Sequence, residues 1–296
     1  MSGLKTAVQR ANLAVMVALA RLPLPWLRAL GWVLGRVLYA VVSKRRHIAL
    51  TNWRLCFPEQ TEAQRRAAVK AHFVCFAQAW LDRGWLWEAS RAVVARRLRL
   101  VGDLAALAGS APTVVFAPHF VGMDAGWTAL TVHLPRKLCG LYAPQKNAVV
   151  DAWMARGRQR FGEPQVVSKW QGLKPLGTAI RDGCPLYLLP DMDHGLGDSV
   201  WASFFGVPAA TLTSLPRLAR LGKAQVLCVT ARLTPNGYDV EVGPVWTQYP
   251  SADLHADVQR MNDELAQRIL TMPEQYYWVH KRFKTRPANE PSVYER

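Results

Sequence analysis

Short apolar stretches alternate with longer amphipathic ones from residue 113 to residue 271, and this alternation restricts the fold more than any other feature. The stretches with the β-branched and aromatic composition of strands are 113–117, 138–142, 185–189, 226–233 and 238–242. The segments with helical periodicity are 123–133, 147–161, 173–182, 211–222 and 255–271. Such alternation predicts a layered α/β domain with a mixed central sheet, which the last of the five strands closes.

A longer helix is predicted ahead of the alternating region. Residues 60–90 place apolar side chains near one face and charged side chains on another. Thr61 followed by Gln64 resembles a capping box, which is typical of a helix start. The chain contains no internal repeat, low-complexity tract or long linker, so we expect one domain, residues 46–296, after an N-terminal segment, residues 1–45.

The N-terminal segment is both basic and apolar. The chain has a net charge of +16, and nine of its basic residues precede Glu59, the first acidic residue. Neither apolar run of the segment reaches the roughly 20 residues of a spanning helix without an arginine or a proline. The pattern favours a hydrophobic membrane-anchoring helix or hairpin that lies in the bilayer interface, with its arginines reaching the lipid phosphates.

The flanks of this segment support the same interpretation. The cluster Lys44-Arg45-Arg46 follows the apolar stretch, as basic residues do on cytoplasmic flanks, and it attracts anionic lipids. No small-residue cleavage site follows residue 20, so we do not expect a removable signal peptide. The alternative is that 11–43 forms a buried pair of helices.

The excess of positive charge does not indicate a nucleic-acid-binding protein. The basic residues are interleaved with leucine, valine and tryptophan, and the sequence has no zinc-finger spacing, RNP-like motif or basic region with heptads. The five cysteines are widely spaced and include no C-x-x-C pair, so neither a zinc site nor a disulfide framework is expected. Reduced thiols indicate a reducing compartment, most simply the cytosol.

A histidine stands where open α/β sheets keep their functional groups. Pro118 ends the predicted strand 113–117 and places His119 on the loop at the carboxyl end of that strand. Asp124 follows five positions later, and the two side chains meet if His119 precedes a helix whose first turns hold Asp124. A carboxylate on one imidazole nitrogen leaves the other as a base for a weakly acidic alcohol. The alternative is that His119 caps the helix and Asp124 complements its dipole.

Two further groups of charged residues are candidates for a binding site. Arg156, Arg158 and Arg160 lie together in a predicted helix, where they either clamp a phosphate or form a solvated face. Asp191 and Asp193 follow a predicted strand, and one of them shapes the site by pairing with the arginines. A metal held by this D-x-D pair is the weaker alternative. The sequence has no P-loop and no G-x-G-x-x-G.

An apolar turn is predicted over 204–211, leading into the helix at 211–222. Gly206 allows the turn to be tight, and Thr211 or Thr213 caps the helix. The two adjacent phenylalanines of the turn either wall a substrate tunnel or belong to the core.

Seven motifs extend over nearly the whole chain. They are Asn52-x4-Phe57-Pro58-Glu59, His119-x4-Asp124, Tyr142-x-Pro144-x2-Asn147, Arg156-Gly157-Arg158 with Phe161-Gly162, Pro190-Asp191-x-Asp193-x-Gly195, Phe204-Phe205-Gly206-x-Pro208-Ala209-x-Thr211, and the block Pro273-Glu274-Gln275-Tyr276-x-Trp278-x-His280-x-Arg282-Phe283-Lys284-Thr285-Arg286-Pro287. In these motifs the chain resembles the late acyltransferase family of lipid A biosynthesis. The terminal block is the most specific of them.

The resemblance implies an H-x4-D/E acyltransferase that takes a fatty acyl group from acyl carrier protein and uses no cofactor and no metal. It implies that His119 and Asp124 form the general-base dyad, that Arg158 binds substrate phosphate or the carrier, and that Asp191 is a supporting carboxylate. One departure is visible. The family often has His-Phe-Gly-Asn-Trp-Glu, whereas here Phe120 is followed by Val121-Gly122-Met123-Asp124, which keeps the charge on a shorter side chain.

The implied acceptor is a Kdo-lipid A precursor, acylated on a hydroxyl of an existing 3-hydroxyacyl chain. The implied location is the cytoplasmic face of the inner membrane of a Gram-negative bacterium. The expected partners are acyl carrier protein, the Kdo-lipid A precursor and anionic inner membrane lipids, and not nucleic acid. Two alternatives stay open: an acyltransferase for another membrane glycolipid or aminolipid, and a non-catalytic membrane-bound lipid-binding protein.

Overall fold

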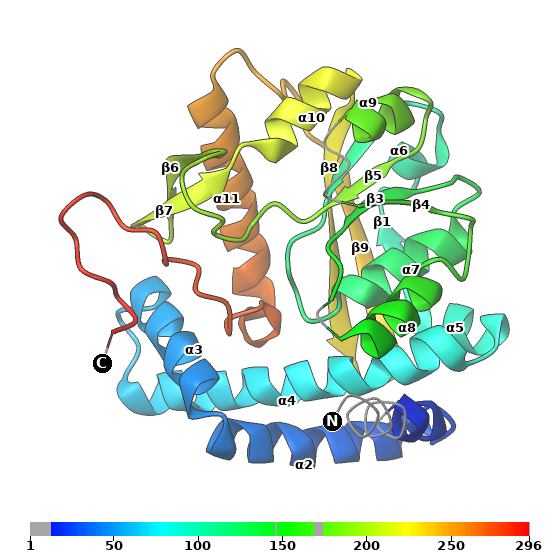
Figure 1. Ribbon diagram of the computed structural model, residues 1–296, viewed down its shortest axis with the longest axis vertical. Helices are drawn as coiled ribbons and strands as arrows, with labels where there is room; N and C mark the ends of the chain where they lie inside the picture. The colour runs from blue at the N-terminus through cyan, green and yellow to red at the C-terminus, as the bar shows by residue number, and fades with distance from the viewer. Residues whose placement is uncertain (1–12, 146, 169–173, 296) are drawn as a thin grey trace.

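A mixed β-sheet forms the centre of the protein (Figure 1). The structure is a computed structural model that describes residues 13–145, 147–168 and 174–295. The strands of the sheet are β1 (Leu98–Gly102), β2 (Thr113–Phe116), β3 (Cys139–Tyr142), β4 (Gln165–Ser168), β5 (Leu186–Leu188), β8 (Gln225–Thr234) and β9 (Gly237–Val245). In the described residues their order is β1-β9-β8-β2-β5-β3-β4, and all neighbours are parallel except β8 and β9. The predicted α/β architecture with a mixed sheet is confirmed.

Helices lie on both faces of this sheet and beneath it (Figure 1). They are α2 (Leu24–Val41), α3 (Ser43–Cys56), α4 (Glu62–Glu88), α5 (Arg91–Arg97), α6 (Ala105–Ala108), α7 (Met123–His133), α8 (Ala148–Arg158), α9 (Lys174–Arg181), α10 (Ser214–Gly222), α11 (Leu254–Thr271) and the short 3₁₀ helix η2 (Pro273–Gln275). Val114 and Phe116 of β2 join a core with α9, α10 and α11, whereas Val115 and Ala117 join a core with α7 and α8. Both faces of β2 are therefore buried, which is why the strand is apolar at every position.

The edge of the sheet differs from the prediction. We expected the strand at 238–242 to close the sheet, but β9 lies between β8 and β1, because β1 pairs with it in parallel. Strands β1 and β4 were not predicted, since Arg99 interrupts the apolar run of one and the other has polar residues, Gln165 and Ser168, at both ends. Composition alone does not identify a strand that is short and partly polar.

The predicted turn over 204–211 is instead most of a β-hairpin. Strands β6 (Ser199–Phe204) and β7 (Val207–Leu212) pair in antiparallel fashion. The two loop residues, Phe205 and Gly206, have φ angles of 52° and 78°. This left-handed geometry is that of a two-residue type I′ turn, which suits the twist of a hairpin. The helix predicted from 211 accordingly starts later, at Ser214.

The long helix α4 runs beneath the sheet, and α2 lies along it (Figure 1). The predicted capping box is present, because the Thr61 hydroxyl accepts from the backbone N–H of Gln64 and the Gln64 side chain accepts from that of Thr61. The backbones of α2 and α4 approach closely at Gly35, where an added Cβ would stand 2.4 Å from the Cα of Val74. A glycine is therefore required at that crossing.

A buried ion pair also fastens α2 to the domain. Arg28 of α2 donates to Asp82 of α4 at 2.5 Å, and the Asp82 carboxylate is fully buried. Asp82 also accepts from the Tyr238 hydroxyl at 2.7 Å and from the Trp85 indole at 2.8 Å. One face of α2 thus belongs to the core of the protein, as the buried-helix interpretation of this segment expects.

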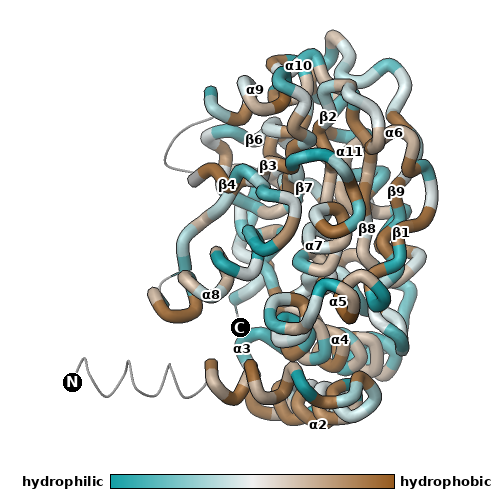
Figure 2. The backbone as a smooth tube through the Cα atoms, turned by 90° about the vertical axis from the view of Figure 1, so that its right-hand side faces the viewer, coloured by the Kyte–Doolittle hydropathy of each residue, from teal (hydrophilic) through white to brown (hydrophobic). Residues whose placement is uncertain are grey.

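The opposite face of α2 is apolar and exposed. Trp26 and Val41 are 70% and 67% exposed, and Trp32, Val33 and Val37 lie between them. Figure 2 shows this helix as a hydrophobic strip at one end of the molecule.

The described residues, 13 onward, do not form the separate anchoring helix that the N-terminal sequence suggested. In the described part of the chain, no single helix has the length and apolarity needed to cross a bilayer; α2 and α3 meet that test only as a pair, bent by 91°. The expected boundary between residues 45 and 46 falls inside α3. Residues 1–12 of the predicted anchor lie outside the described residues.

Candidate active site

Two loops meet at the carboxyl ends of neighbouring strands and carry a histidine–carboxylate pair. Strands β2 and β5 are parallel neighbours, so the segments that follow them emerge on the same edge of the sheet. Nδ1 of His119, after β2, lies 2.7 Å from a carboxylate oxygen of Asp191, after β5. The backbone N–H of His119 donates to the same carboxylate at 3.1 Å. The loop is therefore held to Asp191 by both its side chain and its backbone.

The contact with Asp191 determines which ring nitrogen of His119 carries the proton. Asp191 is fully buried, whereas the side chain of His119 is 16% exposed. Burial acts to raise the pKa of the Asp191 carboxyl, but the adjacent His119 and the hydrogen bonds to it outweigh burial, and the pKa lies below its usual value. A charged carboxylate on Nδ1 keeps a proton there and leaves the lone pair of Nε2 available as a base.

Asp124 has different partners from those that the sequence suggested. It lies in the first turn of α7 and is buried. Its two oxygens accept from the Nε of Arg83 at 2.8 Å and from the Nε of Arg158 at 2.9 Å. Burial acts to raise the pKa of the Asp124 carboxyl, but Arg158 and Arg83 outweigh burial and lower it.

The predicted contact between His119 and Asp124 is therefore absent: His119 is hydrogen-bonded to Asp191, and Asp124 forms ion pairs with Arg83 and Arg158. The strand pairing of β2 with β5 brings Asp191 to Nδ1, and the first turn of α7 directs Asp124 toward α4 and α8. Asp191, which we expected only to support the site, is the carboxylate that touches the ring. Arg83 was not predicted as a site residue, because an arginine within a long helix carries no signal of its own.

His119, Asp124 and Arg158 all line one cavity of about 340 Å³. Its remaining wall is largely apolar and includes Trp127, Leu141, Val166, Tyr187, Leu188 and Met192. Trp127 is fixed in this wall because its indole N–H donates to the carbonyl of Arg158 at 2.8 Å and its ring meets Tyr187 edge to face. A mainly apolar cavity with a few convergent polar groups is the usual form of a small-ligand site.

The predicted arginine cluster is divided among three environments. Arg158 ends α8 and reaches the cavity with 23% of its side chain exposed. Arg156 is mostly exposed and pairs with Glu88, and Arg160 donates to the backbone carbonyls of Leu86 and Ala89. Of the three, Arg158 alone lines this cavity, so a shared phosphate clamp is not formed.

The two aspartates of the D-x-D pair also have different partners. Asp191 contacts His119, whereas the carboxylate of Asp193 accepts from the backbone and hydroxyl of Thr285. Among the described residues, no group of three or more His, Cys, Asp or Glu side chains is arranged to hold a metal ion. The two phenylalanines that were candidates for a tunnel wall do not line the cavity, and Phe204 is buried beside Phe283.

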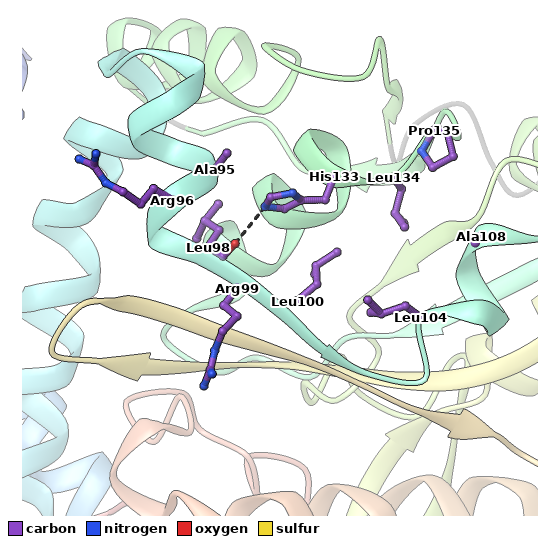
Figure 3. A pocket seen from close by; sticks show the side chains of 10 residues that line it. All are labelled: Ala95, Arg96, Leu98, Arg99, Leu100, Leu104, Ala108, His133, Leu134 and Pro135. Atoms are coloured by element: carbon purple, nitrogen blue, oxygen red, sulfur yellow. Dashed lines mark hydrogen bonds between the residues drawn. The ribbon is translucent and has the colours of Figure 1, made fainter.

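A second cavity, of about 560 Å³, lies beside β1 (Figure 3). Its lining is mainly aliphatic and includes none of the predicted site residues. The one histidine in it, His133, makes a hydrogen bond through Nε2 with the carbonyl of Leu98 at 2.9 Å. The lining of this cavity includes no carboxylate side chain, whereas that of the first cavity includes Asp124 beside His119 and Arg158.

Comparison with known proteins identifies the family of the chain. A model of the family described as bacterial lipid A biosynthesis acyltransferase matches residues 2–285. The chain is 30% identical to a lipid A biosynthesis lauroyltransferase of Escherichia coli (strain K12), over 96% of this chain and 93% of the relative. It is 29% identical, over the same shares, to a lipid A biosynthesis palmitoleoyltransferase of the same strain.

Among solved structures, the 1-acyl-sn-glycerophosphate (LPA) acyltransferase of Thermotoga maritima aligns with a TM-score of 0.38 and 13% identity, over 82% of this chain and 94% of that one. A likeness at this level carries no argument about activity. The family match spans nearly the whole chain and includes every residue of the site. This protein is therefore an acyltransferase and belongs to the bacterial lipid A biosynthesis acyltransferase family.

Proposed function

We propose that this protein transfers a fatty acyl group from acyl carrier protein to a hydroxyl group of a Kdo-lipid A precursor. The observation that carries the proposal is the His119 imidazole, which lines an apolar cavity while its Nδ1 is held by the buried carboxylate of Asp191. The cavity suits an acyl chain, and the imidazole suits the proton of a hydroxyl group. The names of the two Escherichia coli relatives, a lauroyltransferase and a palmitoleoyltransferase of lipid A biosynthesis, support the transfer of a fatty acyl group in lipid A biosynthesis.

In this reaction, Nε2 of His119 accepts the proton of the acceptor hydroxyl while the oxygen attacks the thioester carbonyl carbon. The C–O bond forms, the tetrahedral intermediate collapses and the C–S bond breaks. The imidazolium then returns the proton to the leaving thiolate of the carrier. Asp191 orients the ring through Nδ1 and stabilises its positive charge. The scheme requires no metal and no cofactor.

In this proposal Asp124 supports the site through two arginines, whereas the sequence suggested that it contacts the His119 ring. Its carboxylate holds Arg83 and Arg158 and so keeps the Arg158 guanidinium at the cavity. Because Nε and Nη2 of Arg158 both point to Asp124, the remaining N–H groups are available to an anion. A developing oxyanion and an acceptor phosphate are the two anions that this geometry suits.

We also propose that the exposed face of α2 rests on the cytoplasmic side of the inner membrane. Trp26, Trp32 and Val37 supply an apolar surface, and the guanidinium of Arg36 lies over the Trp32 ring at 4.3 Å. The basic cluster 44–46 follows directly after α2, where it suits anionic lipid headgroups. An interfacial position of this kind would bring the cavity to a lipid acceptor without a spanning helix.

The test is acyl transfer by the purified protein from acyl-loaded carrier protein to a Kdo-lipid A precursor, with products identified by mass spectrometry. His119→Ala should abolish transfer, and Asp191→Asn should reduce kcat by up to about 10⁴-fold, as loss of an orienting carboxylate does in other histidine-dependent sites. His255→Ala is the matched control, because His255 is exposed at the start of α11, and it should keep the wild-type rate.

Three outcomes would contradict the proposal. Near-normal transfer by His119→Ala would remove the proposed base. Transfer to another glycolipid or to an aminolipid, with none to the lipid A precursor, would support the alternative acceptor. Lipid binding without transfer to any acceptor would support the non-catalytic alternative.

A further inference from the structure

The C-terminal segment 275–285 contacts both loops that carry the histidine–carboxylate pair. One contact is on the loop of His119, and the other is on the loop that runs from Asp191 to Gly195. No residue of this segment lines the cavity. Its contacts therefore act on the two loops and not on the occupant of the cavity.

The contact on the first loop is a short antiparallel bridge of backbone. The N–H of Val121 donates to the carbonyl of Gln275 at 2.8 Å, and the N–H of Tyr277 donates to the carbonyl of His119 at 2.9 Å. Phe120 and Tyr276 face each other across this bridge. Because hydrogen bonds hold the backbone at and after His119, they also fix the direction in which its side chain leaves the loop.

The contact on the second loop is centred on Asp193, which is 3% exposed. Its carboxylate accepts from the N–H of Thr285 at 2.6 Å, from the Thr285 hydroxyl at 2.7 Å and from the N–H of Gly195 at 2.9 Å. Hydrogen bonds to a charged acceptor are among the stronger ones in proteins. The carboxylate of Asp193 is thus occupied by protein donors.

His280 holds the backbone of the same residue. Its Nε2 accepts the N–H of Asp193 at 3.1 Å. Burial, together with the nearby His119 and Arg282, lowers the pKa of His280 to about 4. The ring is consequently neutral near pH 7, with Nε2 free to act as an acceptor.

We propose that Asp193, Thr285 and His280 are positioning residues that hold Asp191 against Nδ1 of His119. The proposal rests on the proposed function, in which His119 is the base. Asp193 follows Asp191 by only two residues, so a displacement of Asp193 also displaces Asp191. A displacement of about 1 Å at a catalytic group can reduce the rate by about 100-fold.

The first experiment replaces Thr285 with valine, which keeps the shape and the backbone N–H but removes the hydroxyl that donates to Asp193. Thr285→Val should lower kcat by about 10- to 100-fold, with little change in KM for either substrate. Thr285→Ser restores the hydroxyl and should recover most of the rate. Thr113→Val is the matched control, because Thr113 is a buried threonine at the opposite end of β2, and it should leave the kinetics unchanged.

The second measurement does not depend on transfer activity. In protein labelled with ¹⁵N-histidine, the signals missing from His119→Ala identify the His119 ring. In the wild type we expect Nδ1 to carry the proton and to show a strong hydrogen bond, as the contact with Asp191 requires. Thr285→Val should weaken that signature while the protein stays folded, and Thr285→Ser should restore it.

The outcomes separate this proposal from the proposed function. Wild-type kcat and an unchanged His119 signature in Thr285→Val would overturn the positioning role. Parallel losses of kcat, signature and melting temperature that serine does not rescue would also overturn it, since they indicate general unfolding. A changed signature in an enzyme that transfers no acyl group would support the positioning role and contradict the proposed function.

Discussion

Asp124 is a buried carboxylate whose charge is balanced by two guanidinium groups. Arg83 and Arg158 approach its two oxygens at 2.8 and 2.9 Å. Removing one member of a buried ion pair leaves the other charge uncompensated, and this usually destabilises a protein strongly. The same carboxylate also keeps Arg158 at the cavity, so stability and activity are linked at this residue.

We predict that Asp124→Asn lowers the free energy of unfolding by about 3 kcal/mol at neutral pH. Because the pKa of Asp124 is depressed in the folded state, its contribution is complete above the unfolded carboxyl pKa of about 3.9 and is lost as pH falls toward the folded value. Denaturant unfolding at a series of pH values should therefore show a constant difference from pH 5 to pH 7, which narrows below about pH 4.

Asp239→Asn is the comparison for that experiment. Asp239 pairs with Arg99, whose side chain is 69% exposed, so its loss should cost at most about 1 kcal/mol. A difference between wild type and Asp124→Asn that persists unchanged at pH 3 would show that the charge of Asp124 does not cause the stabilisation.

Helices α2 and α4 pack against each other most closely at Gly35. At Gly35 the two helices approach so closely that a Cβ would stand 2.4 Å from the Cα of Val74 and 2.6 Å from the carbonyl of Phe73. Both atoms belong to backbone and cannot turn away. The helices must separate if a side chain is introduced there.

We predict that Gly35→Ala destabilises the protein by about 1–3 kcal/mol through overpacking, although alanine is the better helix former. Gly109→Ala is the matched control, because an added Cβ there meets only the carbonyl of Ala105 at 3.9 Å. Thermal unfolding followed by circular dichroism compares the two. A melting temperature of Gly35→Ala at or above that of the wild type would contradict the close packing.

At the scale of the whole molecule, α2 presents one face to the core and the other to solvent. Leu24 and Leu27 are buried, and Arg28 pairs with the buried Asp82, whereas Trp26 and Trp32 are exposed. Deleting α2 would remove core packing together with the apolar surface. Substitutions on the outer face separate the two roles.

We predict that Trp26→Ser combined with Trp32→Ser reduces binding to vesicles that contain anionic lipid by at least 10-fold and leaves the melting temperature nearly unchanged. Burial of two tryptophans in a lipid interface contributes several kcal/mol, which is more than this factor requires. Leu27→Ser is the opposite control, because it should lower the melting temperature. Equal sedimentation of the double variant and the wild type with vesicles would exclude this face as the membrane surface.

The sequence alone predicted those elements that a single local pattern determines. Helix α7 begins and ends at the predicted residues, 123 and 133, which lie between two loops that the sequence also indicates. The capping box of Thr61 and Gln64 predicted where α4 starts, because the motif is a local one. His119 was identified from a buried strand ending in proline, and its place at the carboxyl edge of the sheet followed from that pattern.

The sequence by itself determined the layered α/β class, most of the helices, and the loops on which His119 and Asp191 lie, because periodicity and strand ends are local properties. Only the tertiary structure decided which carboxylate meets the imidazole. Residues 119 and 191 are brought together by the pairing of β2 with β5, and spacing along the chain does not encode that pairing. Spacing along the chain instead favoured Asp124, whose carboxylate forms ion pairs with an arginine of α4 and an arginine of α8.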